Sequence, residues 1–229
     1  MNLNEELQRI KEIMQVDEMA YPTDFKFEEY GNIKSFAGKI KYAQERLLGK
    51  VGAGSGRAVF RVDDEKVLKV ALNAKGVAQN ASEAEGYKQN YEIVAKVFDA
   101  DQDDAWVEME LAKKVNPNRF KQLTGVSLEE VVTWLGYITG KVLYRPHQTV
   151  PNDLSENEFA EDLRTFAADY DYPVPGDFGR INSYGEVLRN GQPRIVLVDF
   201  GYDSDAAEVY NASNERSFQR ARQRQLNRY

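Results

Sequence analysis

Three glycines at alternate positions, Gly52, Gly54 and Gly56, lie between two runs of strand-forming residues. Glycine lets a backbone turn tightly and bring its N–H groups up to phosphate oxygens, because no Cβ stands in the way. Ser55 lies among them and belongs to the same candidate phosphate site. The alternative is a flexible hairpin tip. The segment is not a Walker A loop, because no Gly-Lys-Ser/Thr follows and a strand rather than a helix comes next.

A lysine, Lys69, stands at the centre of the apolar run at residues 67–71. A buried lysine without a partner is costly, so Lys69 either faces solvent through strand alternation or reaches a nucleotide phosphate and pairs with a carboxylate. The next predicted helix offers Glu83 and Glu85. We favour Glu83, because the residues that follow it then form a packed helix face beside it.

Two acidic motifs lie in the last third of the chain. Four apolar residues at 195–198 predict a buried strand that delivers Asp199 at its carboxyl end, where a carboxylate is well placed to hold a divalent cation. Asp177 lies in a loop, and Asn182 follows it five residues on. In such a loop the acid can orient an attacking hydroxyl while the amide coordinates a metal ion.

The elements that must position these residues form two groups. Residues 45–112 predict five strands with one helix after the third. The strands are a first one ending in the glycines, then residues 58–62, 67–72, 93–98 and 105–111. Asn80 is the expected N-cap of the helix, with Glu83 answering it three residues on, and the helix is expected to end near Tyr91.

The second half is predicted to be mainly helical, with one hairpin. Two capping-box patterns, Ser127 with Glu130 and Ser155 with Glu158, open two of its helices. The hairpin strands are expected near residues 186–188 and 194–198, joined through the turn signal Asn190-Gly191. Further helices are expected at residues 2–16 and 35–48 from apolar spacing, and a helix or frayed tail at 214–229.

In this order, the motifs over about residues 47–205 resemble those of the protein-kinase-like phosphotransferases. The resemblance implies a two-lobed α+β fold, with a five-stranded antiparallel sheet and one helix in the first lobe and a reduced, mostly helical second lobe. It implies four segments: an N-terminal helical extension, the first lobe, the second lobe and an Arg-rich tail, at residues 1–46, 47–112, 113–210 and 211–229.

The same resemblance implies transfer of the γ-phosphoryl group of ATP, with Mg²⁺, to a hydroxyl on a protein or a small molecule. Lys69 would grip the α- and β-phosphates, and Asp177 would orient the acceptor. Asn182 and Asp199 would hold Mg²⁺. The glycine-rich loop would cover the phosphates, while backbone groups of Glu110 and Leu111 would hold adenine at the hinge between the lobes.

The chain also departs from the family pattern. Arg57 stands where the third glycine belongs, and Pro175-Gly176 replaces the usual His-Arg before Asp177. The pair Gly176-Asp177 resembles the loop of aminoglycoside- and choline-kinase-type enzymes more closely, but Pro175 replaces the histidine that precedes it there. No Ala-Pro-Glu motif follows Gly201. These departures favour an alternative, a pseudokinase kept as a binding or structural module. Small, cysteine-free kinase-like chains of this kind resemble phage-encoded proteins, which would make the partner a host or virion component.

The composition of the chain excludes several kinds of site and limits the partners that the protein could bind. The chain has 229 residues, a formal net charge of −7, no cysteine and one histidine, His147, which is expected to be a surface residue. Disulfides, thiolate metal sites and a multi-histidine metal site are therefore excluded. We expect a cytoplasmic protein (the host cytoplasm, if phage-encoded), because no signal peptide or membrane span is evident. A protein partner could dock on the N-terminal helix or the Arg-rich tail, whereas the acidic total does not favour nucleic acid.

Overall fold

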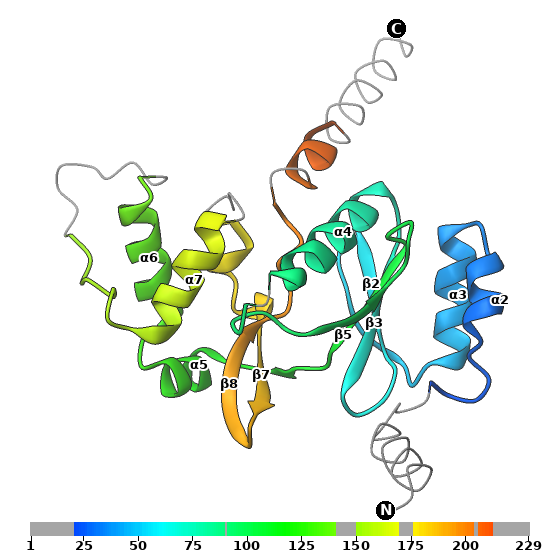
Figure 1. Ribbon diagram of the computed structural model, residues 1–229, viewed down its shortest axis with the longest axis horizontal. Coiled ribbons are helices and arrows are strands. Elements are labelled where there is room, and N and C mark those ends of the chain that lie inside the picture. The colour runs from blue at the N-terminus through cyan, green and yellow to red at the C-terminus, as the bar shows by residue number, and fades with distance from the viewer. Residues whose placement is uncertain (1–20, 90, 141–149, 170–175, 204–205, 213–229) are drawn as a thin grey trace, which may run out of the picture.

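The fold is built around a five-stranded antiparallel sheet, and the computed structural model describes residues 21–89, 91–140, 150–169, 176–203 and 206–212. The strand order is β1-β2-β3-β5-β4. The strands are β1 (Lys50–Ala53), β2 (Arg57–Arg61), β3 (Lys66–Ala71), β4 (Val97–Ala100) and β5 (Trp106–Glu110). Helix α4 (Ala74–Lys88) follows the third strand and packs against the sheet (Figure 1). The predicted α+β class, with five strands and one inserted helix, is confirmed.

Both faces of this sheet are covered. Leu68, Val70 and Trp106 form one face and pack against aromatic residues of the segment that includes α2 (Phe27–Asn32) and α3 (Phe36–Arg46). The alternate residues of β3 and β5 point to the other face, toward α4 and the second half of the chain. Figure 1 shows α2 and α3 on the opposite side of the sheet from α4. From Val67 to Ala71, every side chain of β3 is therefore buried, whichever face it points to.

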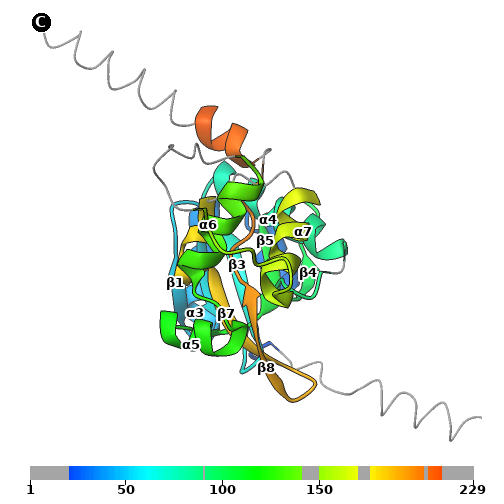
Figure 2. The same ribbon diagram turned by 90° about the vertical axis from the view of Figure 1, so that its left-hand side faces the viewer.

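Among the described residues, the second half adds a small sheet, three helices that follow one another before it is completed, and a helical stretch at residues 206–212. The sheet has the order β6-β7-β8. Its strands are β6 (Lys113–Lys114), β7 (Tyr184–Arg189) and β8 (Gln192–Leu197), and the helices are α5 (Pro117–Thr124), α6 (Leu128–Ile138) and α7 (Glu158–Asp169). Figure 2 shows these helices in front of the strands. The predicted hairpin is confirmed, since Asn190 and Gly191 join β7 to β8 with φ values of 52° and 76°.

Several local predictions about helices need correction. The helix carrying Glu83 begins seven residues earlier than the Asn80 signal suggested, because Asn73 accepts hydrogen bonds from the N–H groups of Lys75 and Gly76. Asn80 is instead buried, and its side chain donates to the carbonyl of Asp104. The capping box at Ser127 is confirmed. The one at Ser155 is wrong, because the Asn157 side chain accepts from the N–H of Ala160 at the start of α7. Helices α2 and α5 were not predicted.

The predicted strand at residues 93–98 is divided between the two sheets. Ala95 donates its N–H to the carbonyl of Leu197, and the N–H of Leu197 donates to the carbonyl of Ile93. Only the part from Val97 onward joins β5 in the large sheet. The segment thus ties β8 to the first half of the chain and holds the two halves together.

The predicted helix at 2–16, the Arg-rich stretch at 214–229, His147 and Pro175 lie outside the described residues. Within the described ranges, no helix is both long enough and apolar enough to cross a bilayer.

Candidate functional site

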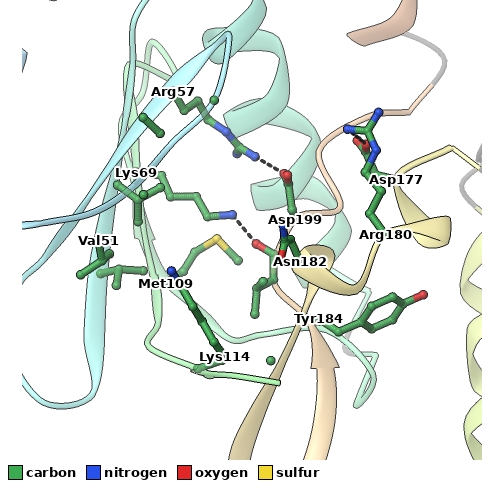
Figure 3. A pocket seen from close by; sticks show the side chains of 18 of the residues that line it. Val51, Arg57, Lys69, Met109, Lys114, Asp177, Arg180, Asn182, Tyr184 and Asp199 are labelled. Carbon is green, nitrogen blue, oxygen red and sulfur yellow. Dashed lines mark hydrogen bonds and ion pairs between the residues drawn. The ribbon is translucent and has the colours of Figure 1, made fainter. Parts of the chain in front are cut away.

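A cavity of about 970 Å³ opens where the large sheet meets β7, β8 and the short 3-10 helices η1 (Gly176–Gly179) and η2 (Ile181–Ser183). In Figure 3, Arg57 and Lys69 reach into it from the sheet, while Asp177, Asn182 and Asp199 come from the opposite wall. Nine residues singled out from the sequence line this one cavity. They are Gly52, Gly54, Ser55, Lys69, Glu110, Leu111, Asp177, Asn182 and Asp199. Segments distant in sequence therefore meet at this cavity.

Lys69 is paired within the fold. Its side chain is only 7% exposed, and its ammonium donates to both carboxylate oxygens of Glu83, at 2.8 and 2.9 Å. It also donates to the carbonyl of Val198, which precedes Asp199. Glu83 is fully buried in α4, whereas Glu85 is exposed and pairs with Lys88. Lys69 therefore pairs with Glu83, the partner favoured from the sequence, and the two alternatives are wrong, since Lys69 does not face solvent and Glu85 is not its partner.

Arg57 is the functional candidate that sequence reasoning missed. It was noted only as a departure from the glycine pattern, yet its side chain is 7% exposed and forms a fork on Glu83, with Nη1–Oε2 at 2.6 Å and Nη2–Oε1 at 2.9 Å. Nη2 also lies 2.6 Å from Oδ1 of Asp199. The signal that could have found it is an arginine, rather than a small residue, at the end of a phosphate-type loop.

The buried charges stabilise one another. Burial alone would raise the pKa of Glu83, but the adjacent charges of Arg57 and Lys69 outweigh burial, so this pKa lies below its ordinary value of 4.5. Burial lowers the pKa of Lys69 against the opposing influence of Glu83. Burial would also lower the pKa of Arg57, but Glu83 and Asp199 outweigh it and raise this pKa further. Glu83 is therefore a carboxylate held between two cations.

Asp177 lies on the cavity wall in η1, with a side chain that is 17% exposed. Burial, and then the nearby charge of Asp199, raise the pKa of Asp177 above its ordinary value of 3.8, while Arg180 acts against them. Arg180 Nη1 lies 3.1 Å from Oδ1 of Asp177. A carboxylate with a raised pKa at a cavity wall suits proton transfer better than an ordinary surface aspartate does.

The predicted hinge residues, Glu110 and Leu111, line the cavity, but their backbone N–H groups are hydrogen-bonded to other backbone carbonyls. Glu110 N–H donates to the carbonyl of Lys96, and Leu111 N–H donates to the carbonyl of Glu65. The Glu110 carboxylate turns to Arg189, at 2.8 Å. These two N–H groups are therefore already hydrogen-bonded within the fold and are not free to donate to a ligand at this edge.

Gly56 has a packing role that the phosphate-loop prediction did not include. It is not one of the cavity-lining residues, and a Cβ built on it would lie 2.7 Å from Gln79 Oε1 and 3.0 Å from the backbone nitrogen of Gly76. A Cβ on Gly76 would collide with the carbonyl of Gly56. The loop therefore rests directly on the first turns of α4, and glycine is needed on both sides of this contact.

We expect Gly76→Ala to lower the free energy of unfolding by about 1–3 kcal/mol, because the added methyl group meets backbone atoms that cannot rotate away. Gly54→Ala is the matched control, since nothing lies within 4 Å of a Cβ at that position. Thermal or urea unfolding of both variants measures the difference. Equal stability of the two variants would contradict the close contact between the loop and α4.

The cavity offers a donor set that fits a magnesium ion held with a nucleotide. No cluster of three or more His, Cys, Asp or Glu side chains able to hold a metal occurs among the described residues. Asp199 and Asn182 both line the cavity and supply hard oxygen donors, and the Asp199 side chain is 45% exposed. Mg²⁺ commonly takes only one or two protein ligands and completes its shell with phosphate oxygens and water. Asp199 and Asn182 thus fit Mg²⁺ bound together with a polyphosphate.

The solved structures that match this chain include the following two. SAICAR synthase from Saccharomyces cerevisiae, complexed with SAICAR, matches at a TM-score of 0.35 and 13% identity, over 66% of this chain and 72% of that one. The aminoglycoside phosphotransferase APH(2")-IIa, in its ternary complex with streptomycin and ATP, matches at a TM-score of 0.32 and 12% sequence identity. This match covers 74% of this chain and 71% of that one. Both have a protein-kinase-like fold. No protein-family model matches the sequence, and no curated protein matches it significantly.

Proposed function

We propose that this chain is an ATP- and Mg²⁺-dependent phosphotransferase that moves the γ-phosphoryl group to a hydroxyl acceptor. The observation that carries the proposal is the convergence of Lys69, Asp177, Asn182 and Asp199 on one cavity beneath a glycine-rich turn. A binding-only module has no physical need for all four. The cavity has the size range of a small-molecule or cofactor site.

Each residue has a role that follows from its position. Lys69, held by Glu83, would present its ammonium to phosphate oxygens, and the turn at Gly52–Ser55 would lie over them. Asn182 and Asp199 would hold the metal ion, which when bound neutralises phosphate charge. Asp177 accepts a hydrogen bond from the acceptor hydroxyl and takes its proton as the oxygen attacks the γ-phosphorus and the bond to the β-phosphate oxygen breaks. Catalysis comes mainly from positioning and charge neutralisation.

The test uses ATP labelled at the γ-phosphate. With Mg²⁺ and no added acceptor, slow release of labelled phosphate to water, or labelling of the protein itself, is expected from the wild type. Chelation of Mg²⁺ should abolish both. Nucleotide binding with no release and no labelling in cell extract, or no nucleotide binding at all, would instead support the binding-module alternative.

A further inference from the structure

The side chain of Arg57 is built into the floor of the cavity. It is the first residue of β2, where it pairs with Ala71, and Val59 pairs with Lys69, so strand alternation puts Arg57 and Lys69 on the same face. The fork on Glu83 uses both terminal nitrogens of the guanidinium, which fixes its plane as well as its position. Asn80 lies 3.4 Å from Nη1 on the helix side. Arg57 is therefore a preorganised cation.

The charges around Arg57 sum to zero only because Arg57 is present. Arg57 and Lys69 contribute two positive charges, and Glu83 and Asp199 contribute two negative ones. Without Arg57, the same floor would carry a net charge of about −1, which repels a polyphosphate. Salt screens buried charges poorly, so this difference reaches a ligand in the cavity.

Arg57 also donates a hydrogen bond to one carboxylate oxygen of Asp199, the candidate metal ligand. Its Nη2 lies 2.6 Å from Asp199 Oδ1, while the Asp199 side chain remains 45% exposed toward the cavity. A cation arriving at Asp199 therefore shares the carboxylate with a guanidinium that is already there. The carboxylate attracts a metal ion less strongly than it would alone.

We propose that Arg57 determines how strongly nucleotide binding depends on metal, acting as a fixed cation that supplies part of the charge neutralisation usually left to Mg²⁺. This inference rests on the proposed function and concerns the same cavity. According to this inference, Arg57 allows the cavity to bind a nucleoside triphosphate in the absence of metal. Adding Mg²⁺ then raises the affinity for the nucleotide less than it would in a cavity without Arg57.

The test measures the dissociation constant of ATP by isothermal titration, once in EDTA and once in saturating Mg²⁺. Arg57→Met removes the charge and keeps the length, and Glu83 remains paired with Lys69. In EDTA we expect Arg57→Met to weaken ATP binding by roughly ten- to a hundredfold, the range of a charge-assisted hydrogen bond. In Mg²⁺ the loss should be about threefold, because the metal ion then binds an unshared Asp199.

The matched control is Arg61→Met, which removes a positive charge from the same strand but outside the cavity, where Arg61 pairs with Asp64 at the surface. It should change neither constant by more than about twofold. If Arg57→Met weakens binding equally in EDTA and in Mg²⁺, or in neither, the inference is wrong while the proposed function stands. A wild type that binds no ATP in either buffer overturns the proposed function, and the inference with it.

A second variant keeps the inference testable if Arg57→Met does not fold, which its melting curve will show. Arg57→Lys retains the charge and loses only the fork. We expect its affinity for ATP in EDTA to stay within about threefold of the wild type. A loss as large as the one expected from removing the charge would overturn the role of Arg57 as a phosphate-site cation.

Discussion

Glu83→Gln is expected to lower the free energy of unfolding by about 3–5 kcal/mol, the largest stability effect of any single substitution considered for this chain. The Glu83 carboxylate is fully buried and lies between the guanidinium of Arg57 and the ammonium of Lys69. An amide in its place leaves two buried cations with only the half-exposed carboxylate of Asp199 nearby. Chemical unfolding at neutral pH measures the loss, and Glu85→Gln, on the exposed side of the same helix, should change stability by less than about 1 kcal/mol.

The pH dependence of this variant gives a second readout. Because the folded state lowers the pKa of Glu83, its ionisation stabilises the fold fully above the ordinary value of 4.5, and this contribution is lost as pH falls through the lower folded value. The wild type should therefore lose stability on acidification below 4.5 more steeply than Glu83→Gln does. Parallel pH profiles, or equal losses in the Gln variants at 83 and 85, would contradict the buried charge cluster.

Asp177→Asn is expected to reduce phosphoryl transfer by about 10²- to 10⁴-fold while leaving ATP binding nearly unchanged. The amide keeps the shape of the side chain but cannot accept the proton of the attacking hydroxyl. Release of labelled phosphate measures the rate, and titration with ATP measures the binding. Asp64→Asn, at the exposed turn between β2 and β3, is the control for the loss of one negative charge. A rate like that of the wild type would remove Asp177 from the mechanism.

The same substitution should not destabilise the ligand-free protein. Since burial and Asp199 raise the pKa of Asp177, the folded state binds its proton more readily than the unfolded state, and ionisation of this group lowers stability as pH rises above its ordinary value of 3.8. This cost grows as pH rises through the raised folded value, and asparagine removes it. The melting temperature of Asp177→Asn should therefore equal or exceed that of the wild type, as expected where a residue is kept for function rather than stability.

The sequence predicted the elements whose signals are local. The apolar run around Lys69, the buried strand before Asp199 and the Asn190-Gly191 turn all depend on neighbouring residues, and these two strands and this turn are found close to their predicted positions. Local signals of the same kind predicted five strands with one inserted helix, although the predicted strand at 93–98 is divided between the two sheets. The prediction that Asn80 starts the helix failed because the real cap, Asn73, lies where the helix meets the glycine-rich turn.

The sequence could not predict which charges meet across the cavity. Arg57 and Asp199 are 142 residues apart, and their contact depends on how the two halves of the chain pack together. Glu83 was favoured over Glu85 as the partner of Lys69 and is the residue found there, although the predicted helix start was seven residues too late. The close approach of Gly56 to Gly76 likewise depends on the tertiary fold, so Gly56 was interpreted only as a phosphate-loop residue.

The most direct test of the shared magnesium–nucleotide site is the melting temperature of the protein with ATP alone and with ATP plus Mg²⁺, for the wild type and for Asp199→Ala. Binding to the folded state raises the melting temperature in proportion to the logarithm of one plus the ratio of ligand concentration to dissociation constant. We predict an additional rise with Mg²⁺ in the wild type that Asp199→Ala loses. No shift at millimolar ATP, or a magnesium-dependent shift that survives in Asp199→Ala, would contradict the convergence of these residues on one site.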